Sequence, residues 1–286
     1  MPKMTFFNLL KYDFLLSSFT GVLESLEHLN EVLPKLYSDY FELEREKVRK
    51  NDKVSATEFP KIIEIFKLVK QNDLVNVQTK MSQLSTDALV FVLNMTETYN
   101  KKSTTEDFLR QMSIAYLITT FEEFLEKTLK LVFLYKPETL KSENMVKYEE
   151  IINLKTYEGI IEHIIEKKSK SIIDKPILEL GKTLLDNFGF NLMNDKDWKN
   201  FIEVFYRRHV IIHNKAQADD EYRYKTGNKS ITDLSPTEDY IKQTILLFKD
   251  FSIKISKFFS TKYPESDAIA QKYVPTGKHE SKWAYF

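Results

Sequence analysis

The chain has 286 residues, of which 42% are hydrophobic, and it carries 42 basic and 42 acidic side chains. A net charge of zero argues against a surface that coats nucleic acid broadly, although a local basic cleft is compatible with it. The absence of cysteine excludes disulfides, thiolate nucleophiles and cysteine-ligated metals. Because Lys3, Lys11 and Asp13 interrupt the apolar N-terminus, we expect no signal peptide or membrane partner, and a soluble cytoplasmic protein.

The spacing of apolar residues predicts an all-α fold. Glycine is scarce, with six in the chain, and no segment alternates with the period of a strand. Leucines from Leu23 to Leu36 recur at helical spacing, a charged turn is expected around 44–53, and helices follow near 58–71 and 73–99. The polar segment YNKKSTTED then predicts a domain boundary near residue 101.

The second part of the chain has clearer helix signals. Ser103 and Glu106 have capping-box spacing, which predicts a helix from Thr104 to about residue 135. Helices are expected near 155–168 and 176–188. Domain ranges follow from these signals: an N-terminal helical region at 1–100, a helical domain at 101–262 and an irregular tail at 263–286.

Two further helices frame the segment of most interest. Asn194 is a good N-cap for a helix from Asp195 to about Asn214. Ser235, followed by Pro236 and by Glu238 three residues on, predicts the start of a last long helix ending near Phe259. A polar loop joins the two.

A charged side chain occupies the apolar face of the 195–214 helix. On a helical wheel, Arg208 falls among Phe201, Phe205 and Ile212, whereas His213 falls on the adjacent stripe with Tyr206 and His209. A buried guanidinium needs a carboxylate, a ligand or a second chain, unless its head reaches solvent. Arg208 and His213 lie about 7.5 Å apart along the axis, so the long arginine side chain can point into a cleft flanked by the imidazole.

One fixed cation beside one group that titrates near neutrality suits RNA cleavage by its own 2′-hydroxyl. The imidazole can accept or relay the 2′-OH proton. The guanidinium can stabilise the charge on the pentavalent phosphate. Such chemistry requires no metal and no cofactor.

The segment RRHVIIHN resembles the signature of HEPN domains, in which an arginine is followed after four to six residues by a histidine. The segment SIAYLITTFEEFLEKTL is similar to the first long helix of these domains, and GNKSITDLSP with its closing helix is similar to prokaryotic members. The resemblance covers about residues 103–260. In one toxin subgroup a tyrosine stands two residues after the histidine; here that residue is Lys215, so we do not expect that mode of control.

The resemblance implies a helical-bundle domain that acts as a metal-independent endoribonuclease, with Arg208 and His213 as catalytic residues. It also implies a toxin or anti-phage defence effector, with an antitoxin or defence protein as a possible partner. Members of the family usually dimerise, so that two Arg–His motifs face one composite cleft. The competing interpretation is a non-catalytic helical module for RNA binding or protein interaction.

Other candidate residues carry alternatives. Glu122 matches the glutamate of the family's pattern and is either a buried partner of Arg208 or a solvated side chain. His209 supports Arg208 or a phosphate, or pairs with His213 on a metal, for which no third ligand is evident. Asn214 either supports the site or caps the helix. Three further residues are weak candidates for RNA binding: Tyr206, Tyr222 and Lys215.

Overall fold

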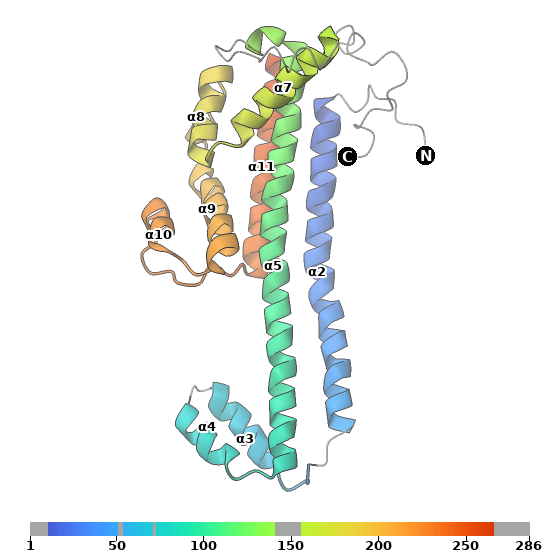
Figure 1. Ribbon diagram of the computed structural model, residues 1–286, viewed down its shortest axis with the longest axis vertical. Coiled ribbons are helices and arrows are strands. Elements are labelled where there is room, and N and C mark those ends of the chain that lie inside the picture. The colour runs from blue at the N-terminus through green and yellow to red at the C-terminus, as the bar shows by residue number, and fades with distance from the viewer. Residues whose placement is uncertain (1–10, 51–53, 71–72, 141–155, 266–286) are drawn as a thin grey trace, which may run out of the picture. The chain divides into compact units, whose positions relative to one another are not determined.

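The computed structural model describes residues 11–50, 54–70, 73–140 and 156–265. Within these ranges every named element is helical, and a single isolated β-bridge joins Gln217 and Asp233 (Figure 1). The predicted all-α class is thereby confirmed. No helix among the described residues is both long and apolar enough to cross a membrane.

The described residues form the following helices in chain order. They are α2 (Tyr12–Lys50), α3 (Phe59–Lys70), α4 (Leu74–Met81), α5 (Thr86–Tyr135), η1 (Pro137–Leu140), α7 (Tyr157–Ile173), α8 (Ile177–Phe188), η2 (Leu192–Asn194), α9 (Trp198–Asn214), α10 (Asp220–Thr226) and α11 (Glu238–Lys262).

The chain forms two compact units, and the division differs from the predicted one. The larger unit contains residues 1–27 and 111–286, and the smaller contains residues 28–110. Helix α5 runs without interruption through the expected boundary near 101, so Ser103 and Glu106 lie inside a helix and do not cap one. The first helix likewise extends through most of the charged segment predicted to be a turn.

Aromatic side chains hold the core of the larger unit together. Phe121 of α5 meets Phe201 of α9 edge to face, with ring centroids 5.3 Å apart, and Phe248 of α11 at 5.1 Å. Phe201 also stacks on Phe251, at 4.1 Å and 10° between the ring planes. Large rings in edge-to-face and stacked contact contribute both burial and orientation, so α9 is fixed against α5 and α11.

The ends of α9 and α11 lie close to their predicted positions, but different residues cap them. Helix α9 begins at Trp198, because residues 192–194 form a 3-10 turn and Asp197 is the residue before the helix. Helix α11 is capped by Thr237, whose side chain accepts a hydrogen bond from the backbone N–H of Tyr240. The predicted cap residues, Asn194 and Ser235, stand outside these helices.

Helix α8 approaches the start of α9 closely because it carries a glycine there. A Cβ atom at Gly181 would lie 3.1 Å from the ring of Trp198. This close approach anchors the first turn of α9, while the aromatic cluster fixes its middle.

The smaller unit has a core of its own. Six buried residues from α3, from the turn after α4 and from the start of α5 form it: Ile62, Ile65, Leu84, Ala88, Phe91 and Val92. The turn before α5 is held by Glu58, which accepts hydrogen bonds from the backbone N–H and the hydroxyl of Ser85.

Candidate active site

Helix α9 carries every strong candidate. Its predicted apolar face is buried at Phe201, but Val210 is buried as well, so the helix is covered on more than one side. Ile212, predicted on the buried face, is 48% exposed. Arg208 therefore stands at the edge between the core and solvent, not in the middle of a buried stripe.

Arg208 has one buried donor without a partner. Its Nε lies out of contact with solvent and forms no hydrogen bond with any described residue. A buried N–H without an acceptor costs on the order of 1–3 kcal/mol. The rest of the side chain is half-buried, so the guanidinium has one donor in the protein wall and others turned toward solvent.

Glu122 of α5 is the acidic group that Arg208 faces. Burial raises the pKa of the Glu122 carboxyl, the positive charge of Arg208 opposes this rise, and Asp174 at the end of α7 adds to it. No ion pair joins Glu122 and Arg208 among the described residues. Glu122 and Arg208 therefore interact through their charges without direct contact. The guanidinium of Arg208 is free to bind another anion.

We expect Glu122→Gln to stabilise the fold at neutral pH. Because the folded-state pKa is raised, the fold favours the protonated acid; that stability is present below about pH 4 and is lost as pH rises through the folded pKa. Glutamine imitates the protonated form. Thermal unfolding should therefore show a higher midpoint for the variant at pH 7.5 and no difference at pH 4.

The adjacent Glu123→Gln is the matched control, since Glu123 is exposed and pairs with Lys127 at 2.6 Å. The Glu123→Gln variant should not raise the unfolding midpoint at pH 7.5, because it removes only an exposed ion pair, which contributes little to stability. A lower midpoint for Glu122→Gln at pH 7.5 would show instead that attraction to Arg208 outweighs the burial of the carboxylate.

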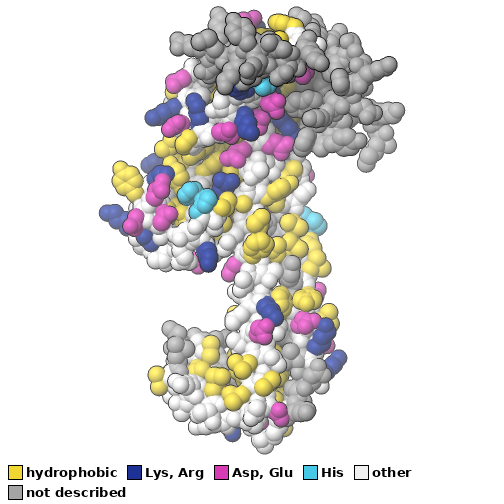
Figure 2. Space-filling view, in the orientation of Figure 1, with side chains coloured by type: hydrophobic (Ala, Val, Ile, Leu, Met, Phe, Trp, Pro, Cys, Tyr) yellow, Lys and Arg dark blue, Asp and Glu magenta, His cyan; other side chains and the backbone are white. Residues whose placement is uncertain are grey.

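His209 and His213 form an exposed pair on the same helix. Their ring centroids are 4.6 Å apart at 47°, and histidine side chains are visible together over α9 in Figure 2. The structure thus brings both imidazoles to the solvent side of Arg208. Among the described residues there is no group of three histidine, aspartate or glutamate side chains that could hold a metal ion, so the metal alternative has only these two ligands there.

The backbone after His213 turns sharply. Lys215 and Ala216 both adopt positive φ, 50° and 61°, and the Ala216 N–H donates to the carbonyl of Val210. The Asn214 amide donates to the carbonyl of Gln217 at 2.5 Å. Asn214 therefore closes this turn, and Lys215 is exposed at its tip.

The sequence reasoning missed a polar network on the other side of α9. Glu203 accepts hydrogen bonds from Arg207 at 2.8 Å, from the Tyr222 hydroxyl at 2.5 Å and from the Tyr240 hydroxyl at 2.7 Å. The Arg207 guanidinium also lies 3.9 Å over the Tyr240 ring and donates to the carbonyl of Leu234. This network joins α9 to α10, to α11 and to the loop between them.

Two weak RNA-binding candidates are placed differently by the structure. Tyr222 is 3% exposed and its hydroxyl is bound to Glu203, so its ring is part of the core and is not available to stack on a base. Tyr206 is half-buried, and the Lys225 ammonium lies 5.0 Å above its ring. It remains beside the histidine pair as the aromatic neighbour of the site.

The arrangement as a whole offers an anion-binding side chain next to an exposed acid–base group. Arg208 supplies a permanent cation with an unpaired donor, and His213 supplies a proton donor or acceptor one and a half turns away. No family model matches the chain, and neither the characterised proteins nor the solved structures that were searched contain a match. Function must therefore be argued from the site itself.

Proposed function

We propose that the protein is a metal-independent endoribonuclease of HEPN type. The 2′-hydroxyl of the substrate attacks the adjacent phosphorus, the 5′-oxygen leaves, and the products carry a 2′,3′-cyclic phosphate and a 5′-hydroxyl. His213 transfers the proton and Arg208 stabilises the charge on the phosphate oxygens. His209, Asn214 and Glu122 support these two residues.

The proposal rests on Arg208, a half-buried cation that has no ion-pair partner among the described residues. Its Nε is buried in the protein, so a phosphate would bind the terminal N–H groups of the guanidinium. An arginine fork matches two phosphate oxygens. His209 and His213, two exposed imidazoles of the same helix, then supply the acid and the base that cleavage needs.

The neighbouring arginine fits the motif spacing as well, since five residues separate Arg207 from His213. Its surroundings favour a different role. Arg207 is only 12% exposed at its side chain and is held by Glu203 and by the Tyr240 ring. Arg208 has no such partners, so we assign the catalytic role to Arg208.

We further propose that the enzyme acts in the cytoplasm as a toxin or anti-phage effector, restrained by a partner protein. The resemblance in the motif and in the preceding helix supports this role. The buried apolar residues of α9 hold the helix in place. Arg208 forms no ion pair with a described residue, and His209 and His213 are exposed, so a role in RNA cleavage explains them better than packing does. An alternative is a non-catalytic RNA-binding module that uses the same cation.

The same face of α9 suggests a symmetric dimer with a composite cleft. Ile212 is 48% exposed and follows Arg208 by four residues. We expect a particle of about 68 kDa, twice the chain mass of 33.9 kDa. Ile212→Glu should convert it to a monomer without lowering thermal stability, as measured by light scattering. A wild-type monomer at micromolar concentration contradicts the composite site.

Incubation of the purified chain with single-stranded RNA in EDTA tests the function. An HEPN-type enzyme gives fragments with 2′,3′-cyclic phosphate ends, and EDTA leaves the rate unchanged. A binding module gives a salt-sensitive gel shift and intact RNA. A hydrolase using His209 and His213 as metal ligands loses its activity in EDTA.

A further inference from the structure

Helix α2 carries an unbroken heptad pattern. Ten successive positions with alternating spacings of three and four residues are apolar: Tyr12, Leu15, Phe19, Val22, Leu26, Leu29, Leu33, Leu36, Tyr40 and Leu43. Such a repeat sustained over more than four heptads is the signature of a helix that packs along its length against another helix.

Only the first half of this stripe is covered. Tyr12, Phe19 and Leu26 are at most 6% exposed, and the Phe19 ring stacks on Phe124 in the larger unit. In the smaller unit, Leu36 and Leu43 are 58% and 59% exposed. The remaining members there are Leu29, exposed at 44%, Tyr40, exposed at 55%, and the half-buried Leu33.

The stripe turns away from α5 because a straight helix has 3.6 residues per turn. A seam with a period of 3.5 drifts by roughly 20° per heptad around such a helix. In the smaller unit it is Phe41, 7% exposed, that is buried, and Ser38 accepts a hydrogen bond from Lys102 of α5. The drift leaves the residues from Leu29 to Leu43, which span about 21 Å, as a second apolar face that is largely exposed among the described residues.

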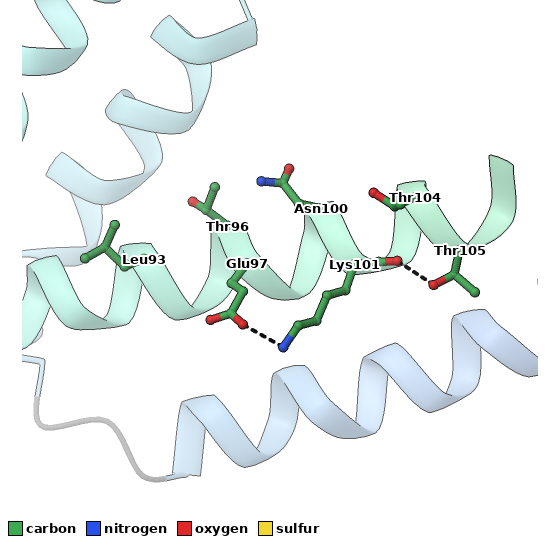
Figure 3. Close-up of a pocket in the computed structure, with 7 residues that line it drawn as sticks. All are labelled: Leu93, Thr96, Glu97, Asn100, Lys101, Thr104 and Thr105. Atoms are coloured by element: carbon green, nitrogen blue, oxygen red, sulfur yellow. Dashed lines mark hydrogen bonds and ion pairs between the residues drawn. The ribbon is translucent and has the colours of Figure 1, made fainter. Parts of the chain in front are cut away.

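A shallow hollow lies on α5 in the smaller unit. It has a volume of about 580 Å³ and is lined by residues of α5 from Leu93 to Thr105. Figure 3 shows Glu97 and Lys101 of this lining pointing toward α2, where they form a 2.6 Å ion pair, whereas Thr96, Asn100 and Thr104 point away from α2. The hollow therefore does not form one groove with the stripe, and the stripe itself is the surface to be covered.

Charges flanking the exposed stripe decide what can cover it. Within the exposed part, the charged residues at the two flanking heptad positions are all acidic: Asp39, Glu44 and Glu46. Glu44 and Glu46 pair with Lys47 and Lys50, but these pairs are exposed and therefore weak. In a parallel pair of identical helices Asp39 would face Glu44 of the second copy, and an antiparallel pair also sets acid against acid.

We propose that the stripe from Leu29 to Leu43 of α2 binds one amphipathic helix of a partner protein, with lysine or arginine flanking the partner's apolar seam. The partner helix lies along α2 and packs its apolar seam on the stripe, as two helices of a coiled coil do. This surface belongs to the smaller unit and its function does not depend on that of the α9 site.

Two labelled synthetic 21-residue helices serve as probes, each with leucine at both seam positions, one with lysine and the other with glutamate at the flanking positions. Fluorescence anisotropy with the full chain should show binding of the basic peptide and at least about tenfold weaker binding of the acidic one. Leu36→Glu should weaken binding of the basic peptide at least tenfold, because it places a charge in the seam.

Leu246→Glu is the matched control, since Leu246 is 64% exposed on α11 and lies in the other unit; it should bind as the wild type does. The double variant Asp39→Lys with Glu46→Lys should reverse the preference toward the acidic peptide. Equal binding of the basic peptide to wild type and Leu36→Glu, or no binding at all, overturns the proposal. A dimer in solution that Leu36→Glu dissociates and Ile212→Glu does not would show that a second copy covers the stripe.

Discussion

Arg208→Ala is expected to lower the rate of RNA cleavage by about 10²–10³-fold, the usual effect of removing one donor that stabilises a transition-state anion. Thermal stability should stay the same, because Arg208 forms no hydrogen bond through its buried Nε and no ion pair with a described residue. Single-turnover cleavage and thermal unfolding measure the two effects on the same preparations.

His213→Ala should lower the rate by about 10²–10⁴-fold, since it removes the group that transfers the proton. His213 is exposed, so its loss leaves the core intact. The double variant should be little slower than the worse single variant, because two residues that act on one transition state are not additive.

The adjacent arginine supplies the control for this prediction. Arg207→Ala breaks the contacts with Glu203 and Tyr240 and should destabilise the protein. Arg208→Ala should instead slow cleavage and leave the stability unchanged. If Arg208→Ala lowers the unfolding midpoint as much as Arg207→Ala and leaves cleavage intact, Arg208 is a structural residue and the catalytic assignment fails.

Helical spacing was sufficient to predict the all-α class and the approximate position of α9, since both depend on local periodicity. The expected break in the helix near residue 101 was wrong, because polar composition does not by itself end a helix. In the smaller unit α5 packs on few neighbours, so Glu97, Asn100 and Thr104 are exposed on a continuous helix. Ser103 and Glu106 have the spacing of a capping box, but they lie inside this helix and cap no helix end.

The candidate residues of α9 were identified in sequence, but their surroundings were not. A wheel shows which residues of one helix share a face, but it does not show which residues of other segments cover that face. Tyr222 and Tyr240, the partners of Glu203, come 19 and 37 residues later in the chain. Only the fold brings α10 and α11 back to α9. A pattern within one helix therefore could not distinguish Arg207, which has a structural role, from Arg208, which has no ion-pair partner among the described residues.

Glu203→Ala is expected to produce the largest loss of stability, about 3–5 kcal/mol, as when one partner of a buried charged network is removed. It leaves Arg207 as a mostly buried cation and leaves two tyrosine hydroxyls without their acceptor. Burial, followed by the charge of Glu203, raises the pKa of Tyr240, so its hydroxyl stays a donor throughout the physiological range. Chemical denaturation at neutral pH, with the unfolding free energy extrapolated to water, measures the effect.

The tyrosine variants apportion this loss. Tyr240→Phe and Tyr222→Phe each remove one hydrogen bond to a charged group, and each should cost about 1.5–3 kcal/mol. Because the three side chains share one carboxylate, Glu203→Ala should add little to the double tyrosine variant beyond the cost of leaving Arg207 buried without its anionic partner.

Glu123→Ala is the control of the same geometry, since Glu123 and Lys127 form an i, i+4 ion pair at 2.6 Å on the exposed side of α5. Exposed pairs of this kind contribute about 0.3–0.5 kcal/mol. A difference of several kcal/mol between the two glutamates would come from burial and from the tyrosines, since sequence spacing and pair distance are nearly the same. If Glu203→Ala costs no more than Glu123→Ala, the network does not hold α10 and α11 against α9, and the orientation of Arg208 and His213 must be fixed by the aromatic cluster alone.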